Sequence, residues 1–263
     1  MNVLLLSDFS LVAINATHYA MDLLQDQQVN FHLLNIFDPD PGSPGANKIH
    51  TQNILKERVE KLQQRAGKRK HKISGHYSEE KLVNAARSFV QQHKIDLIVM
   101  GAVGSEQRHS TILGRHTFEI ISKIKCNILA VAEDSKFIKP KKLLLPLDHT
   151  AFFGEKNIQF LKHSNVFKKA YLEIWEFESQ ALESNRVNFS KEIFNGLKDF
   201  KVNFTPLKDL LMDDKDLWVD VQNKFDLIIL LGKNIRICNR LLHNKNGLYT
   251  KVPNQLPILI MHD

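Results

Sequence analysis

The 263-residue sequence has few cysteines and no long apolar run. Only Cys126 and Cys238 are present, and neither has a second Cys or a His at the spacing of metal ligands. A disulfide framework and a metal site are therefore disfavoured, and a reducing, cytoplasmic compartment is expected. No stretch of about 20 apolar residues occurs, and the first residues lack the basic segment and apolar core of a signal peptide. We therefore expect a protein that is not embedded in a membrane.

The sequence also lacks a strong charge of one sign. It carries 36 Lys and Arg against 29 Asp and Glu, a net charge of +7. The densest basic cluster lies between Arg65 and Lys72, and no aromatic residue is interleaved there to stack on bases. Because a basic last turn complements the helix dipole, we interpret this cluster as a solvated helix end. Nucleic acid is not an expected partner.

Short apolar runs alternate with amphipathic segments through the first half of the chain. Asn2-Val-Leu-Leu-Leu-Ser7 is too short for a helix and predicts a strand buried on both faces, as in a parallel sheet. Ser10 can cap a helix to about Gln25, with Leu11, Ile14, Leu23 and Leu24 facing inward. A second cap is expected at Ser78, followed by two acids. Further strands are predicted at 29–37, 71–75, 95–100 and 127–132, loops at 38–45 and 101–113, and helices at 50–70, 78–93 and 114–123. This alternation predicts a doubly wound, five-stranded α/β sheet.

The same pattern begins again after a basic linker at 136–142. Lys142-Leu-Leu-Leu-Pro-Leu-Asp148 repeats the opening strand and its aspartate at an offset of 140 residues. Asp226-Leu-Ile-Ile-Leu230 repeats Asp96-Leu-Ile-Val-Met100 at an offset of 130, and Pro257–Met261 repeats Asn127–Val131 at the same offset. A period this long indicates domain duplication rather than a solenoid. We expect two tandem Rossmann-like domains, at residues 1–138 and 139–263.

Three features of the first copy should meet at the carboxyl ends of its strands, where open α/β sheets bind ligands. Asp8 follows the first strand, Ile36 ends the second, and Gly101-Ala-Val-Gly104 follows the fourth. Gly101 would allow a sharp turn, Gly104 would let backbone N–H groups face a phosphate, and Gly114 would expose a helix N-terminus. An anion is the expected ligand, although glycines that serve only as turns would give the same pattern.

The segment Asp96-Leu-Ile-Val-Met-Gly101-Ala-Val-Gly104, followed nine residues later by Gly114-Arg115, resembles the nucleotide-binding loop of the universal stress protein family. Leu-Leu-Ser-Asp8-Phe-Ser10 is similar to the family's first strand and aspartate. The resemblance covers the chain twice and implies an adenine nucleotide alpha hydrolase-like fold. It implies a site for ATP, ADP or AMP, with Mg²⁺ able to accompany the phosphates. The site residues that it implies are Ser7, Asp8, Phe9, Ile36, Met100, Gly101, Gly104, Ser105, Gly114, Arg115, His116 and Thr117.

Two departures from the family pattern affect these expectations. Arg115 stands where the family has Ser or Thr, so its guanidinium either donates to a phosphate or fills the pocket. His116 and Thr117 could replace the lost hydroxyl. In the second copy the three glycine positions become Leu231, Asn234 and Asn244, so we expect no ATP there, with Asp148 kept as a strand-end cap.

The favoured function is a regulatory, nucleotide-binding stress-response protein without strong catalysis. Two alternatives remain: an interaction module that has lost nucleotides, or a slow ATPase. No G-x4-G-K-[ST] loop is present. The resemblance also implies that the two domains pair through their last strands, at 127–132 and 257–261. A monomer and a homodimer of such pairs are both compatible with that pairing.

Overall fold

The computed structural model describes residues 1–37, 44–103, 113–148, 154–178, 197–198, 200–208, 217–234 and 255–262. In the first half the elements are β1 (Asn2–Leu6), α1 (Leu11–Leu23), β2 (Val29–Ile36), α2 (Pro44–Ala66), β3 (His71–Ser78), α3 (Leu82–His93), β4 (Leu97–Gly101), α4 (Arg115–Lys123) and β5 (Asn127–Val131). In the second half they are β6 (Lys142–Asp148), α5 (Glu155–His163), α6 (Asn165–Lys169), β7 (Tyr171–Glu178), β8 (Lys201–Lys208), α8 (Leu217–Lys224), β9 (Leu227–Leu231) and β10 (Ile258–Met261).

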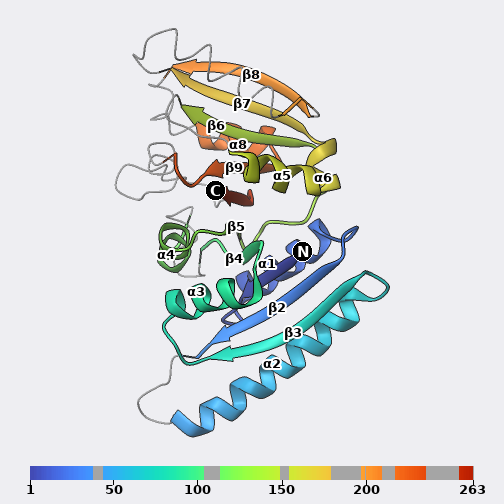
Figure 1. Ribbon diagram of the computed structural model, residues 1–263, viewed down its shortest axis with the longest axis vertical. Coiled ribbons are helices and arrows are strands. Elements are labelled where there is room, and N and C mark those ends of the chain that lie inside the picture. The colour runs from blue at the N-terminus through green and yellow to red at the C-terminus, as the bar shows by residue number, and fades with distance from the viewer. Residues whose placement is uncertain are drawn as a thin grey trace.

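One continuous sheet of ten strands runs through the molecule in the order β3-β2-β1-β4-β5-β10-β9-β6-β7-β8 (Figure 1). The order β3-β2-β1-β4-β5 recurs in the second half as β8-β7-β6-β9-β10, which confirms the predicted doubly wound α/β fold. Within each half every strand pair is parallel. The two predicted five-stranded sheets are thus one sheet, while the domain limits at 138 and 139 stay a prediction.

The halves join through an antiparallel contact between β5 and β10. Leu259 lies opposite Leu129, and Ile260 lies opposite Ile128. All four side chains are almost fully buried. This contact confirms the expected pairing through the last strands, and it removes two apolar strand edges from solvent.

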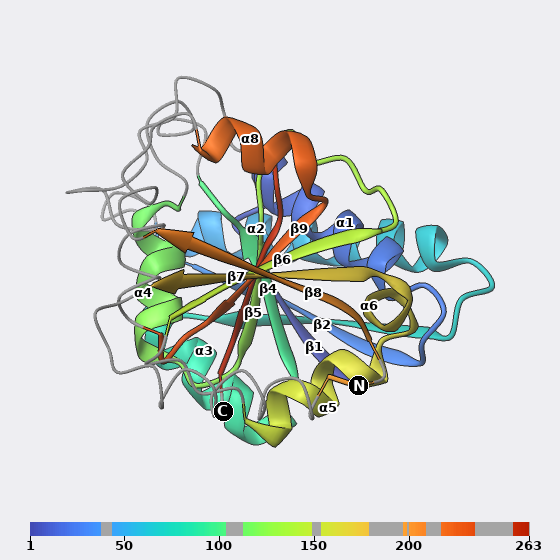
Figure 2. The same ribbon diagram turned by 90° about the horizontal axis from the view of Figure 1, so that it is seen from above.

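Each face of the sheet carries one apolar core that crosses the join between the halves. Val3 and Leu5 of β1 pack on the side of α1 and α2, whereas Leu4 and Leu6 pack on the side of α3 and α4. Burial on both faces explains why β1 is a continuous apolar run rather than an alternating one. Seen from above, the strands fan out with a progressive twist between the edges of the sheet (Figure 2).

Several local predictions are wrong. Leu11 is 71% exposed, because it occupies the first turn of α1, and the buried side of that helix begins at Val12. Ser78 ends β3 and accepts a hydrogen bond from the N–H of Glu80 (3.1 Å), so it does not cap α3, which begins after Lys81. The predicted loop at 38–45 gives way to α2 at Pro44, a residue suited to a first helical turn. The predicted Ser10 cap is confirmed, since its Oγ accepts from the N–H of Ala13 (3.4 Å).

Candidate functional site

The strand order reverses between β1 and β4, and the segments that follow these two strands lie side by side. β1 pairs with β2 on one side and with β4 on the other. The chain leaves β1 through Ser7–Ser10 into α1, and it leaves β4 at Gly101–Val103. Ligands of open α/β sheets bind at such a switch point. The predicted residues on these segments are therefore brought together.

The turn after β1 holds the Asp8 carboxylate at the surface. Ser7 is buried, its N–H donates to the Leu34 carbonyl (3.1 Å), and its Oγ accepts from the N–H of Phe9 (3.1 Å). Phe9 adopts a left-handed φ of 65°, which is unfavourable for a residue with a side chain. Asp8 is exposed, and its Oδ1 accepts from both the N–H (3.0 Å) and the hydroxyl (2.5 Å) of Ser10. The carboxylate is thus oriented by Ser10, the N-cap residue of α1.

The end of β2 supports this turn through a residue that the sequence analysis missed. Asn35 is 4% exposed, and its Nδ2 donates to the Ser7 carbonyl (2.8 Å). Its Oδ1 is buried without a hydrogen-bond partner among the described residues. The signal for it was a polar residue one position before the end of an apolar strand. The predicted Ile36 ends β2 and packs, half-buried, against the core on the side of α3 and α4.

Gly101, at the end of β4, is required for a reason other than the predicted one. A Cβ built on it would lie 2.7 Å from Cγ2 and 3.0 Å from Cγ1 of Val12 in α1. Its φ is not positive, so the strand end needs no special turn conformation there. The close approach of α1 to β4 is what excludes a side chain. Met100, the residue before it, is buried in the core on the opposite face.

The N-terminus of α4 faces the same region. The N–H of Gly114 donates to the Ala102 carbonyl (2.7 Å) and is therefore not available to a phosphate. The N-cap residue is Gly114, so no N-cap side chain bonds the amides of the first turn, those of Arg115, His116 and Thr117. Arg115 and His116 are exposed, whereas Thr117 is buried and its hydroxyl donates to the Gly101 carbonyl (2.8 Å). Thr117 thus ties α4 to β4 and does not present its proton to a ligand.

One basic side chain, that of Arg115, lies at this end of α4. The exposed Arg115 side chain extends from the first helical residue. Lys123, whose hydrogen bond and charge are the main causes of the lowered pKa of Glu119, lies at the other end of the helix. With the helix dipole, the Arg115 guanidinium favours an anionic ligand. Gly104 and Ser105, the remaining predicted site residues, lie outside the described residues.

The corresponding place in the second half is built differently. Asp148, the counterpart of Asp8, has an exposure of 0%, so its carboxylate is not presented to a ligand. After β9, a Cβ on Gly232 would lie 2.4 Å from Cε1 of His262, because the imidazole covers that glycine. The residues at the same positions in the first half are Ala102 and Ala132, whose side chains are single methyl groups. At these two positions the first half has two alanine methyl groups, and the second half has Gly232 and the imidazole ring of His262.

The described residues show neither a metal cluster nor a membrane-spanning segment. Within them, no three His, Cys, Asp or Glu side chains converge as metal ligands would. None of the helices in these ranges has the length and apolar character needed to cross a bilayer.

Comparison with known proteins covers both halves of the chain. The family model described as the universal stress protein family matches residues 1–132. The fold of the whole chain resembles that of a universal stress protein from Archaeoglobus fulgidus, at 12% identity and a TM-score of 0.65, over 99% of this chain and 98% of that one. A protein provisionally assigned to the family from Pseudomonas aeruginosa gives 11% identity and a TM-score of 0.60, over 99% and 92%. The chain has no match among curated proteins. Since the family match spans just over half of its residues, and its fold is shared along nearly its full length, the chain belongs to the universal stress protein family.

Proposed function

We propose that the first half binds an adenine nucleotide, ATP, ADP or AMP, and that the protein acts as a nucleotide-responsive regulator in a stress response. The observation that carries the proposal is the pairing of two features at one switch point. An exposed, oriented carboxylate, Asp8, stands at the end of β1, and the N-terminus of α4, whose N-cap residue is Gly114, stands beyond the end of β4.

The charges of these two features match the two ends of a nucleotide. A carboxylate accepts hydrogen bonds, so Asp8 suits the hydroxyls of a ribose or the amino group of adenine. Helix N-terminal amides and an exposed guanidinium donate hydrogen bonds, so the start of α4 with Arg115 suits the phosphates. The exposure of Arg115 favours a donor role over one in which it fills the pocket.

The second half is proposed to act as a structural partner and not as a second nucleotide site. The buried Asp148 and the imidazole of His262 over Gly232 support this assignment. Its contribution is the β5–β10 contact, which closes the apolar edge of the first half.

Mass spectrometry of small molecules released from freshly purified protein tests occupancy and identity together. Calorimetric titration with ATP, ADP and AMP, with and without MgCl₂, then measures affinity. Asp8→Asn should weaken binding about tenfold or more, because it removes a charge-assisted hydrogen bond. Asp26→Asn is the matched control, since Asp26 is also exposed but follows the other end of α1.

Arg115→Ala should weaken ATP more than AMP, because it removes a donor at the phosphate end. Lys125→Ala, an exposed basic residue just beyond the opposite end of α4, is its control. If none of the three nucleotides produces heat and none is released from purified protein, the chain is instead a nucleotide-free interaction module.

The proposal assigns binding without strong catalysis. Incubation of the full chain with ATP and MgCl₂, followed by measurement of released phosphate, distinguishes a sensor from an enzyme. Retention of unchanged nucleotide supports the sensor. Sustained turnover that Asp8→Asn abolishes would assign an ATPase instead.

A further inference from the structure

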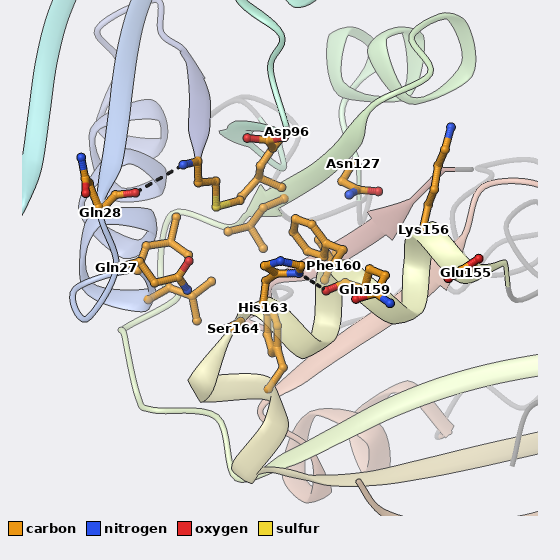
Figure 3. Close-up of a pocket in the computed structure, with 17 residues that line it drawn as sticks. Gln27, Gln28, Asp96, Asn127, Glu155, Lys156, Gln159, Phe160, His163 and Ser164 are labelled. Atoms are coloured by element: carbon orange, nitrogen blue, oxygen red, sulfur yellow. Dashed lines mark hydrogen bonds between the residues drawn. The ribbon is translucent and has the colours of Figure 1, made fainter. Parts of the chain in front are cut away.

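A cavity of about 770 Å³ lies between the two halves, away from the candidate nucleotide site (Figure 3). Its floor includes Leu129 and Leu259, which face each other across the β5–β10 join. Leu23 and Leu24 at the end of α1 form one wall, and Phe160 of α5 and Phe167 of α6 form another. We call it the inter-half cavity. It opens at the amino ends of β1, β4 and β5, whereas the nucleotide site lies at the carboxyl ends of β1 and β4.

The internal repeat supplies a second position that should be equivalent to this cavity. The cavity lies beside Asp96, whose Oδ2 accepts from the N–H of Asn2 at the start of β1 (2.7 Å). Asp226, 130 residues later, accepts in the same way from the N–H of Lys142 at the start of β6 (2.9 Å). The region beside Asp226 is therefore the counterpart of the inter-half cavity.

That counterpart position is filled by the linker between β5 and β6. The ring of Phe137 packs edge to face on Tyr19 of α1, with ring centroids 5.3 Å apart. The last residue of the linker, Lys141, donates its N–H to Oδ2 of Asp226 (2.8 Å). Burial, and then the charge of Asp226, raise the pKa of Tyr19. The linker is held there because Nδ2 of Asn15 donates to the carbonyls of Ala132 (2.8 Å) and Ser135 (2.9 Å).

The linker runs through the molecule once, so it can occupy only one of the two equivalent positions. The residue that corresponds to Tyr19 on the other side is Phe160, 141 residues later. The same offset relates Leu33 to Ile174, which lie opposite Leu5 and Leu145 in their strands. Phe160 is only partly buried and lines the inter-half cavity, where no counterpart of Phe137 is present among the described residues.

A polar group in the wall of the cavity also lacks a partner. Ser164, between α5 and α6, is 4% exposed, and its Oγ has no hydrogen bond among the described residues. Figure 3 shows Phe160, His163 and Ser164 along the α5 and α6 side, with Gln27 on the α1 side. A buried hydroxyl without a partner costs free energy, which a ligand in the cavity recovers once the Ser164 side chain turns toward it.

We propose that the inter-half cavity binds a small aromatic molecule that carries one hydrogen-bonding group. Its ring would pack on Phe160 as Phe137 packs on Tyr19, and its polar group would bond the Ser164 hydroxyl. The volume is within the range of small-molecule sites, about 300–1,000 Å³. Leucine and phenylalanine side chains line the cavity together with polar side chains. The rim carries both signs of charge, from Glu155 and Lys156, which favours a neutral ligand.

The test uses the neutral probe N-phenyl-1-naphthylamine, which has aromatic rings and one N–H donor. Fluorescence titration of the full chain should show saturable binding, and native mass spectrometry should show one probe for each chain. Hydrogen exchange should slow in α5, α6 and the end of α1. Excess ATP should leave the bound probe in place, because the two sites lie at opposite strand ends.

Three variants locate the probe. Gln159→Trp places a large ring at the cavity rim from an exposed position of α5 and should weaken binding at least about tenfold. Ile49→Trp, at a position of α2 that is 65% exposed and does not line the cavity, should leave it unchanged. Ser164→Ala should weaken it about two- to tenfold through the lost hydrogen bond. Lys156→Trp replaces Gln159→Trp if that variant does not fold.

The proposal is overturned if the probe fails to saturate, or if ATP displaces it one for one. It is also overturned if Gln159→Trp and Ser164→Ala bind the probe as tightly as the unmodified chain. A probe that fails to saturate, or variants that bind it unchanged, would leave the nucleotide proposal unaffected, whereas displacement by ATP would mean that ATP and the probe share one site.

Discussion

The contact between Gly101 and Val12 allows the link between helix packing and the nucleotide site to be tested by a double-mutant cycle. In Gly101→Ala the new methyl group would lie 2.7 Å and 3.0 Å from the two Val12 methyl carbons. Ordinary carbon contacts are about 3.5–4.0 Å, so α1 or β4 must shift by roughly half an ångström or more. Val12 is 5% exposed in a packed core, and overpacking of this kind costs about 1–3 kcal/mol.

Val12→Ala removes both of these methyl groups. The lost transfer free energy is about 0.8 kcal/mol for each group, and the cavity left behind adds to it, so about 2–3 kcal/mol is expected. In the double variant the alanine methyl at 101 enters the space that Val12 has left. Its destabilisation should therefore be smaller than the sum of the single values by about 1–2 kcal/mol.

Urea unfolding followed by circular dichroism measures the three variants, and ATP titration measures the site. Gly101→Ala should weaken nucleotide binding because it displaces α1, which orients Asp8 through Ser10. Val12→Ala in the same chain should restore part of that affinity. Additive stabilities within about 0.5 kcal/mol, or a Gly101→Ala chain as stable as the original, would refute this account of the glycine.

Two further predictions concern titratable side chains. Burial, and then neighbouring imidazoles, lower the pKa of half-buried His32 and His76 below the ordinary 6.5, with Nδ1 of His32 3.2 Å from Nε2 of His76. The folded state then binds fewer protons than the unfolded state, so the free energy of unfolding should fall as the pH drops from 7.5 to 5. In urea unfolding, His76→Gln should reduce that loss. His50→Gln, at an exposed position, should not. An equal loss in both variants would contradict the assignment. Burial raises the pKa of the Cys126 thiol to about 12. In a Cys238→Ser chain at pH 8, a disulfide reagent should therefore react with Cys126 only after denaturant is added. Rapid reaction of the native chain would contradict the burial of this thiol.

The strands and their repetition could be predicted because the decisive signal is local. A strand buried on both faces must be apolar at every position, so β1, β4 and β9 stand out in the sequence. The start of α3 could not be placed in the same way. Ser78 followed by two acids satisfies the pattern of a cap, but pairing with β2 extends β3 through that serine. The long-range strand contact outweighs a local preference of about 1 kcal/mol.

The candidate site was predicted as a set of positions but not as a set of roles. Gly101 and Thr117 were expected near the ligand, yet the glycine accommodates Val12 and the threonine hydroxyl bonds the glycine carbonyl. Asp8 and Asp148 follow similar strands, and the sequence does not reveal that one is exposed and the other buried. The inter-half cavity was missed entirely, because its walls come from segments more than 100 residues apart.

The covalent link between the halves has a consequence for how the protein responds to dilution. Ten residues, 132–141, connect β5 in the first half to β6, the first strand of the second half. A short tether keeps its two ends at an effective concentration on the order of millimolar, whatever the number of copies in the cell. The β5–β10 seam therefore stays closed at abundances where two separate chains would come apart. Changes in expression level alter how many intact molecules are present, and they leave the architecture of each one the same.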